Sequence, residues 1–128
     1  MPSARVLILD DDEGIRLLLS RVCRREGYTV ALAGDAYGAF DLLDEITFDV
    51  LICDLDLPGP SSIEVLRHSR EVQPEAKVVI LTGHGNLQTA IDALRLGAFD
   101  YLQKPLDDVA LIPLTVSRAM ERLDLERS

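Results

Sequence analysis

Short hydrophobic runs alternate along this chain with longer stretches in which apolar residues recur every three or four positions. A run of about four apolar residues between polar ones is typical of a buried parallel strand, and the 3.6-residue spacing is typical of a helix. The alternation occurs five times, so it predicts a parallel α/β sheet with a helix after each strand. The predicted strands are residues 6–9, 29–33, 50–53, 78–81 and 101–103.

The helical stretches also predict which side chains face the sheet, because residues three or four apart share one face of a helix. Apolar residues at that spacing form a stripe in the first, second, fourth and fifth predicted helices. In chain order the stripes are Ile15, Leu18, Leu19 and Val22; Ala36, Ala39, Phe40 and Leu43; Leu87, Ala90, Ile91 and Leu94; and Val109, Ile112, Val116, Ala119 and Leu123.

Several residues predict where helices begin and end. Asp35 can cap the second helix, and Ser61 with Glu64 forms a capping-box pattern for the third. Gly27 and Gly97 are typical residues for ending the first and fourth helices.

Two prolines bear on the third and fifth helices. Pro74 is expected to end the third helix. Pro113 falls inside the fifth stripe, where a proline removes one backbone hydrogen bond and costs about 3 kcal/mol in a regular interior. We therefore expect a kink or a late start in the fifth helix.

Composition narrows the class of protein. With 128 residues and 48% apolar content, the chain is sized for one domain with a single core. A net charge of -9 argues against direct binding of nucleic acid or of an anionic membrane, because both require a basic surface. No run approaches the ~20 apolar residues of a membrane span, so a cytoplasmic protein is expected. Cys23 and Cys53 lie in apolar runs and are predicted to be core residues.

Polar motifs follow four of the predicted strands: Asp10-Asp11, Asp54, Thr82 and Lys104-Pro105. The carboxyl ends of parallel strands meet at one edge of the sheet, which is where ligands bind in such folds. The sequence therefore predicts one site built from three acids, a hydroxyl and a cation.

Three carboxylates at one edge repel one another, so at least one pKa should rise unless a cation is bound. Oxygen ligands of this kind suit Mg²⁺. With the metal present, a carboxylate can attack phosphorus to give an aspartyl phosphate. Lys104 and Mg²⁺ would neutralise the transferred group, and the Thr82 hydroxyl could donate to it.

These motifs, in this order, resemble the receiver domains of two-component response regulators. The resemblance covers residues 5 to about 123, and residues 82–86 and 97–105 are most similar to receivers of the nitrogen-regulatory type. It implies a single receiver domain in residues 1–128 with a flavodoxin-like (βα)5 fold and strand order 2-1-3-4-5.

The resemblance also implies a role for each matching residue. Asp54 would accept a phosphoryl group from a histidine kinase or a histidine phosphotransfer protein. Asp11 would bind Mg²⁺ directly and Asp10 through water, while the backbone carbonyl of Asp56 would be a ligand beside Asp54. Such a domain catalyses only its own phosphorylation and dephosphorylation. Asp56 and His84 flank the expected route of the hydrolytic water, and we hypothesise that they tune the lifetime of the phosphorylated state.

A conformational switch is implied as well. Thr82 and Tyr101 match the family's switch pair, in which the hydroxyl moves toward the phosphoryl group and the ring turns inward. This reshapes the face made by the fourth helix, the fifth strand and the fifth helix, through which a homodimer could form. The Lys104-Pro105 peptide is expected to be cis, which an X-Pro bond adopts at modest cost.

A partner surface is implied beside the site. Ile15 and Leu18 also suit the core, and their spacing leaves both readings open. Arg16, with three more arginines of the first helix, forms either a solvated face or a surface that steers an acidic partner. The residues expected to contact the donor's helical bundle are Asp12, Gly14, Ile15, Leu18, Pro105 and Leu106.

The loop after Asp54 departs from the family pattern. Many receivers have an Asp-Gly pair where residues 58–62 of this chain read Pro-Gly-Pro-Ser-Ser. Less conformational freedom is expected there, although Ser61 can still cap the third helix.

Alternatives remain open. Asp54-Leu55-Asp56 also matches the nucleophile motif of haloacid dehalogenase-type phosphohydrolases, although the order of the acidic motifs and the short length argue against that class. A receiver-like interaction module that never needs phosphate is a second alternative. Residue by residue, Asp10-Asp11 could serve only as a helix cap, for which Asp12 and Glu13 are better placed.

Overall fold

The computed structural model describes residues 4–57, 62–83 and 87–128. The described residues form one five-stranded sheet in which all neighbouring strands are parallel, in the order β2-β1-β3-β4-β5. This confirms the predicted α/β class and strand order 2-1-3-4-5. The strands are β1 (Arg5–Leu9), β2 (Thr29–Ala33), β3 (Val50–Asp54), β4 (Lys77–Thr82) and β5 (Asp100–Gln103).

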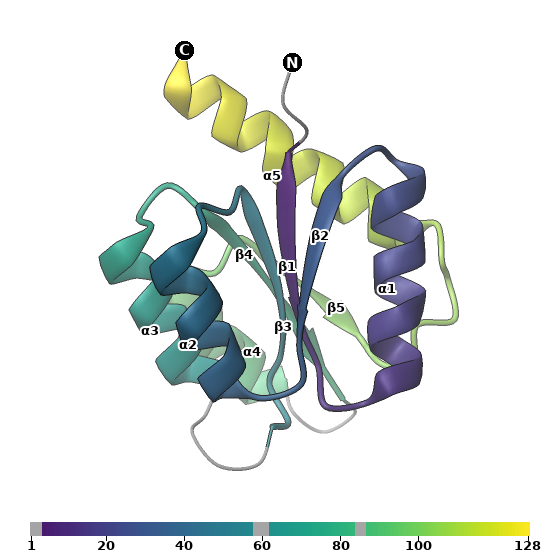
Figure 1. Cartoon of the computed structure of the whole chain (residues 1–128). Coiled ribbons are helices and arrows are strands. Elements are labelled where there is room, and N and C mark those ends of the chain that lie inside the picture. Colours follow the sequence, from purple (N-terminus) through teal and green to yellow (C-terminus); the bar gives the residue numbers. More distant parts are fainter. Residues whose placement is uncertain (1–3, 58–61, 84–86) are drawn as a thin grey trace.

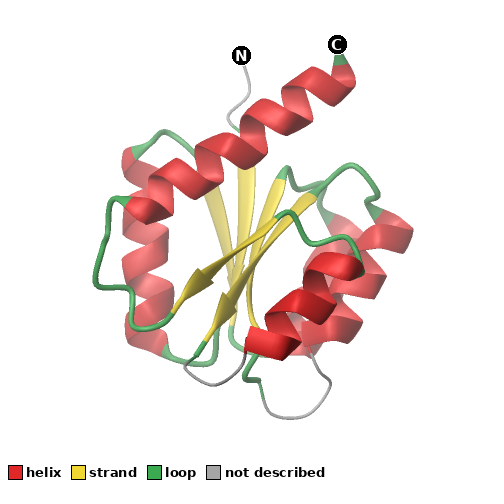
Figure 2. Cartoon of the chain, turned by 180° about the vertical axis from the view of Figure 1, so that it is seen from behind, coloured by secondary structure: helices red, strands yellow, loops and turns green. Residues whose placement is uncertain are grey.

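A helix follows each strand, and the helices cover both faces of the sheet (Figure 1). Helices α2, α3 and α4 lie on one face, and α1 and α5 lie on the other, as the reverse view also shows (Figure 2). The helices are α1 (Glu13–Arg25), α2 (Ala36–Glu45), α3 (Ser62–Val72), α4 (Leu87–Arg95) and α5 (Leu111–Arg127).

The core has two layers because successive side chains of a strand point to opposite faces of the sheet. In β1, Leu7 and Leu9 belong to the cluster under α2, α3 and α4, whereas Val6 and Ile8 belong to the cluster under α1 and α5. All four are fully buried. Burial on both sides explains why β1, β3 and β4 are almost continuously apolar in the sequence.

Helix ends follow the predicted signals where they are described. The Asp35 carboxylate accepts a hydrogen bond from the Gly38 N–H at 2.8 Å, and the Asp12 carboxylate accepts one from the Ile15 N–H at 3.1 Å. Gly27 has φ +91°, a conformation that favours glycine, and it follows the last residues of α1. The predicted capping residue Ser61 lies outside the described residues.

Helix α5 begins at Leu111, so Pro113 lies in its first turn, where the missing N–H would have had no partner within the helix. The late start that Pro113 predicted is therefore confirmed. Val109, predicted to belong to this helix's inward face, precedes the helix and is 45% exposed, so that prediction is wrong.

The inward face predicted for α4 is also only partly right. Ala90 and Ala93 are fully buried, whereas Leu87 and Leu94 are 58% and 36% exposed. The short α4 packs on β4, near one edge of the sheet, and its two alanines make the close contact. The larger residues of the stripe therefore remain at the surface.

Cys23 and Cys53 are free and buried, as predicted. Burial raises the pKa of the Cys53 thiol to about 12 and that of the Cys23 thiol to about 11, so both are protonated at neutral pH and unreactive. Within the described part of the chain, no helix is both long and apolar enough to cross a membrane.

Candidate functional site

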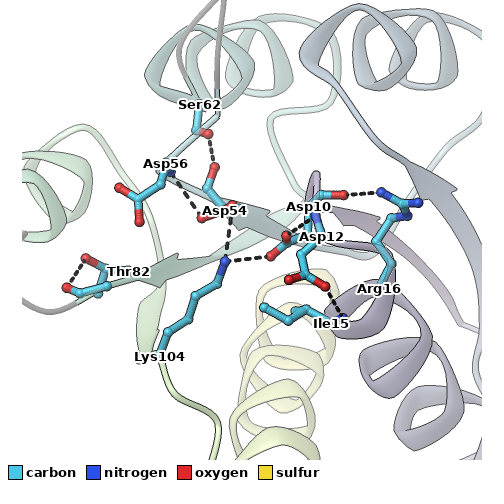
Figure 3. A network of polar contacts seen from close by, with 10 residues as sticks. Asp10, Asp12, Ile15, Arg16, Asp54, Asp56, Ser62, Thr82 and Lys104 are labelled. Atoms are coloured by element: carbon cyan, nitrogen blue, oxygen red, sulfur yellow. Dashed lines mark hydrogen bonds and ion pairs between the residues drawn. The ribbon is translucent and has the colours of Figure 1, made fainter.

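Asp10, Asp54 and Lys104 meet where β1, β3 and β5 end (Figure 3). The Lys104 ammonium lies 2.9 Å from Asp10 Oδ2 and 3.2 Å from Asp54 Oδ2. Both acids are buried, with exposed fractions of 0% and 1%, and the Lys104 side chain is 20% exposed. The sheet thus gathers two buried negative charges and one partly buried positive charge at the carboxyl ends of its strands.

The two buried acids are held by matching local turns. Asp10 Oδ1 accepts a hydrogen bond from the Asp12 N–H at 2.8 Å, and Asp54 Oδ1 accepts one from the Asp56 N–H at 3.1 Å. Each acid therefore binds its own backbone two residues later, as aspartates commonly do in turns. The second oxygen of each carboxylate remains directed toward Lys104.

The main-chain carbonyls of the same two acids are also held, each by the helix that follows its strand. Arg16 Nη1 donates to the Asp10 carbonyl at 2.7 Å, and the Ser62 hydroxyl donates to the Asp54 carbonyl. Ser62 is fully buried and Arg16 is half-buried. The view of Arg16 as part of a solvated basic face is therefore wrong. Neither contact was predicted, because only the loop geometry brings these side chains to a carbonyl.

The charges of the site perturb its pKa values. Burial raises the pKa of Asp54, and the charge of Asp10 raises it further; the hydrogen bond from the Asp56 N–H and the Lys104 ammonium lower it without cancelling the rise. Burial lowers the pKa of Lys104, but the carboxylates of Asp10 and Asp54 outweigh that effect and hold it above its ordinary value. One ammonium thus only partly offsets the two acids.

The acids have a geometry that suits a divalent cation. Carboxylate oxygens of Asp10, Asp11 and Asp54 lie within 4.8 Å of one another, with Asp11 at the exposed side. Asp10 Oδ2 is buried and faces the Lys104 ammonium at 2.9 Å. Three carboxylates so close together, with one ammonium beside them, fit a hard cation such as Mg²⁺.

The structure describes both predicted switch residues, Thr82 and Tyr101. Thr82, the last residue of β4, is 2% exposed, and its hydroxyl faces the carbonyl of Gly83 at 3.4 Å, away from Asp54 (Figure 3). Tyr101 lies on the edge strand β5 with 37% of its surface exposed. The Lys104-Pro105 peptide is cis, the isomer that the resemblance implies.

The residues expected to contact a partner differ in how exposed they are. Ile15 and Leu106 are half-buried against the core under α1 and α5, and Leu18 is also half-buried. Gly14 and Pro105 are exposed. His84, predicted to influence the lifetime of the phosphorylated state, lies outside the described residues.

Comparison with known proteins agrees with this geometry. The family model for the response regulator receiver domain matches residues 6–115. Transcriptional regulatory protein ZraR of Klebsiella oxytoca is 37% identical over 123 residues, covering 96% of this chain and 28% of the relative. FixJ of Bradyrhizobium diazoefficiens is 33% identical over 112 residues, covering 88% of this chain and 55% of the relative.

Solved structures show the same likeness. The receiver domain of NtrX from Brucella abortus superposes with a TM-score of 0.85 at 31% identity, covering 91% of this chain and 98% of that chain. A CheY-like receiver from Methanospirillum hungatei gives a TM-score of 0.91 at 25% identity, covering 98% of this chain and 99% of that chain. The match to this chain spans only 28% of the length of ZraR and 55% of the length of FixJ. By sequence, fold and the match of the family model, it belongs to the response regulator receiver domain family.

Proposed function

We propose that this domain, with its core in residues 5–123, is a phosphoacceptor that takes a phosphoryl group on Asp54 from a phosphohistidine donor in the presence of Mg²⁺. The observation that carries this proposal is the environment of Asp54. Its carboxylate is 1% exposed, lies 3.2 Å from the Lys104 ammonium and shares a cluster of oxygens with Asp10 and Asp11.

The chemistry follows from these contacts. An oxygen of the ionised Asp54 carboxylate attacks phosphorus, the donor's N–P bond breaks, and its electron pair remains on the leaving imidazole. The products are an aspartyl phosphate and a histidine. The raised pKa of Asp54 makes its carboxylate a better nucleophile once ionised. The Asp56 N–H holds one oxygen and so limits the orientations of the attacking group.

Asp10, Asp11, Asp54 and the backbone carbonyl of Asp56 would hold Mg²⁺, with Asp10 acting through a water. When bound, the ion supplies positive charge to the phosphoryl oxygens. The Lys104 ammonium provides a second positive charge, because it already lies at hydrogen-bond distance from the acids. Together these groups oppose the repulsion between the incoming phosphoryl group and the buried carboxylates.

Phosphorylation of Asp54 would change the shape of one surface of the domain. Thr82 would rotate its hydroxyl from Gly83 toward the phosphoryl group, and the exposed ring of Tyr101 would turn inward. This rearrangement biases a two-state element, the face of α4, β5 and α5. Apolar side chains are already exposed there, including Leu87 and Leu114, which supports the use of this face for a homodimer or an effector contact.

The donor would be a histidine kinase or a histidine phosphotransfer protein in the cytoplasm. The surface proposed for it includes the exposed residues Asp12, Gly14 and Pro105. We further propose that Asp56 and His84 set how fast water hydrolyses the acyl phosphate. Unchanged dephosphorylation in Asp56→Asn and His84→Ala variants would remove that part of the proposal.

Intact mass after incubation with acetyl phosphate tests the proposal. The native chain should gain one phosphoryl group only with Mg²⁺ present, and Asp54→Ala should gain none. Absence of an adduct in a folded, Mg²⁺-bound native chain would favour the phosphorylation-independent module. Continuous turnover of p-nitrophenyl phosphate would favour a phosphohydrolase. We propose instead that the domain catalyses only its own phosphorylation and dephosphorylation.

A further inference from the structure

We infer that Arg16 is a positioning residue that orients the Asp10-Asp11 pair for Mg²⁺, and that Gly34 is glycine because the Arg16 guanidinium occupies the space of a side chain there. The inference rests on the proposed function, because it concerns the same metal site. It assigns a role to the Arg16 guanidinium, which does not touch the reacting atoms.

The first observation is how the main chain of Asp10 is fixed. Its N–H donates to the Ala33 carbonyl at 3.2 Å, and its own carbonyl accepts Arg16 Nη1 at 2.7 Å. Because a peptide unit is planar, fixing the Asp10 carbonyl also fixes the plane that leads into Asp11. Asp11 is the exposed member of the carboxylate cluster, and neighbouring helices do not bury it. Arg16 therefore constrains the direction in which Asp11 leaves β1.

The second observation is the space that the guanidinium occupies. A Cβ atom at Gly34 would lie 3.1 Å from Arg16 Nη1 and 3.7 Å from its Cζ. Gly34 does not have the positive φ that Gly27 and Gly97 have, so its backbone conformation does not require glycine. A Cβ atom at Gly34 would instead crowd the Arg16 guanidinium, which would have to shift by a few tenths of an ångström.

The third observation is what Arg16 does not do. Among the described residues, it forms no ion pair with a carboxylate within 4 Å, whereas Lys104 forms two. Its positive charge therefore acts on the acids only from a distance. The two possible roles of Arg16 therefore predict opposite changes in Mg²⁺ affinity. Loss of a nearby positive charge alone should tighten Mg²⁺ binding, whereas loss of a positioning contact should weaken it.

Isothermal titration of Mg²⁺ into Arg16→Ala is the decisive measurement, with Arg21→Ala as a matched control on an exposed part of the same helix. We expect the Mg²⁺ dissociation constant of Arg16→Ala to rise about 10-fold or more, the usual effect of losing a group that orients metal ligands. Arg16→Lys, which keeps the charge and one donor, should lie between the native chain and Arg16→Ala. Equal or tighter binding in Arg16→Ala would overturn the inference.

A double-mutant cycle with Gly34→Ala tests the proposed contact itself. Gly34→Ala should weaken Mg²⁺ binding in the native background and have little further effect in Arg16→Ala, because the displaced group is then absent. Equal effects in both backgrounds would overturn the inference. If Arg16→Ala does not fold, Arg16→Lys replaces it in the cycle. Gly34→Ala should then weaken Mg²⁺ binding less in the Arg16→Lys background than in the native background.

Labelling by acetyl phosphate separates this inference from the proposed function. At saturating Mg²⁺, Arg16→Ala should be phosphorylated at close to the native rate, while the Mg²⁺ concentration for half-maximal rate rises. A native chain that neither binds Mg²⁺ nor becomes labelled would contradict the proposed function. A native chain that binds Mg²⁺ and becomes labelled, together with an Arg16→Ala variant that has the same Mg²⁺ dependence, would contradict only the role of Arg16.

Discussion

Asp10 and Asp54 are held as a matched pair: Oδ1 of each accepts the N–H of the residue two positions later, and Oδ2 of each faces the ammonium of Lys104. The neighbouring strands β1 and β3 deliver them side by side. Both carboxylates are therefore oriented before any ligand arrives. Because one ammonium serves two acids, the site keeps an excess of negative charge that a divalent cation can neutralise.

Removing the shared cation should destabilise the fold. Lys104→Ala leaves two buried carboxylates without their positive partner, and loss of one member of a buried ion pair costs about 3 kcal/mol in the free energy of unfolding. Urea unfolding followed by circular dichroism measures this. Lys77→Ala, which loses a pair with the exposed Glu126, should cost less. Equal costs for the two variants would contradict the picture of a buried charged centre.

The raised pKa of Asp54 predicts a specific pH dependence. A carboxyl that ionises less readily in the folded chain than in the unfolded chain makes stability fall as pH rises from the unfolded value near 3.8 through the higher folded value. Without Mg²⁺, Asp54→Asn should therefore gain stability over the native chain across that window and keep the gain at neutral pH.

Denaturation midpoints at a series of pH values test this, with the exposed Asp41→Asn on α2 as a control for the loss of one surface charge. A stability difference between Asp54→Asn and the native chain that shrinks as pH rises would show that Asp54 is stabilised as a carboxylate.

Ser62 predicts a second effect on stability. Its buried hydroxyl donates to the Asp54 carbonyl, so Ser62→Ala should cost about 1 to 2 kcal/mol in the free energy of unfolding. Ser69, equally buried, donates to the Leu66 carbonyl within its own helix at 2.7 Å. Ser69→Ala should cost less, below about 1 kcal/mol, because helical carbonyls already have a backbone partner. The reverse order would show that the Ser62 contact contributes little.

Mg²⁺ should stabilise the native chain through its affinity for the folded site. At an Mg²⁺ concentration 100 times the dissociation constant, the free energy of unfolding should rise by about 2.7 kcal/mol. Asp10→Asn should lose most of this gain, and Asp41→Asn should keep it. Thermal unfolding with and without the ion measures both. Equal Mg²⁺ stabilisation in the native chain and Asp10→Asn would place the ion elsewhere on the acidic surface.

Much of this structure could be predicted from the sequence because apolar periodicity reports strand and helix identity directly. The strand ends at Asp54 and Thr82 are within one residue of the prediction. Periodicity is less informative about how much of a helix the sheet covers. Leu87 and Leu94 have the spacing of core residues, yet α4 lies where its alanines make the contact.

Contacts between a side chain and a distant main-chain carbonyl could not be predicted. Arg16 and Ser62 have ordinary helix positions, and no spacing rule connects them to Asp10 or Asp54. The departure of residues 58–62 from the Asp-Gly pair of many receivers predicted a local difference, but not this contact. The motif residues themselves were predictable because the parallel sheet forces strand ends to one edge.

The most direct test of the central claim is to find which carboxylate carries the phosphoryl group. Peptide mapping by mass spectrometry after labelling with acetyl phosphate and Mg²⁺ should place the modification on Asp54 alone, and Asp54→Asn should carry none at Asp10, Asp11 or Asp56. Modification of one of those three acids in the native chain would contradict the assignment of Asp54 as the phosphoacceptor.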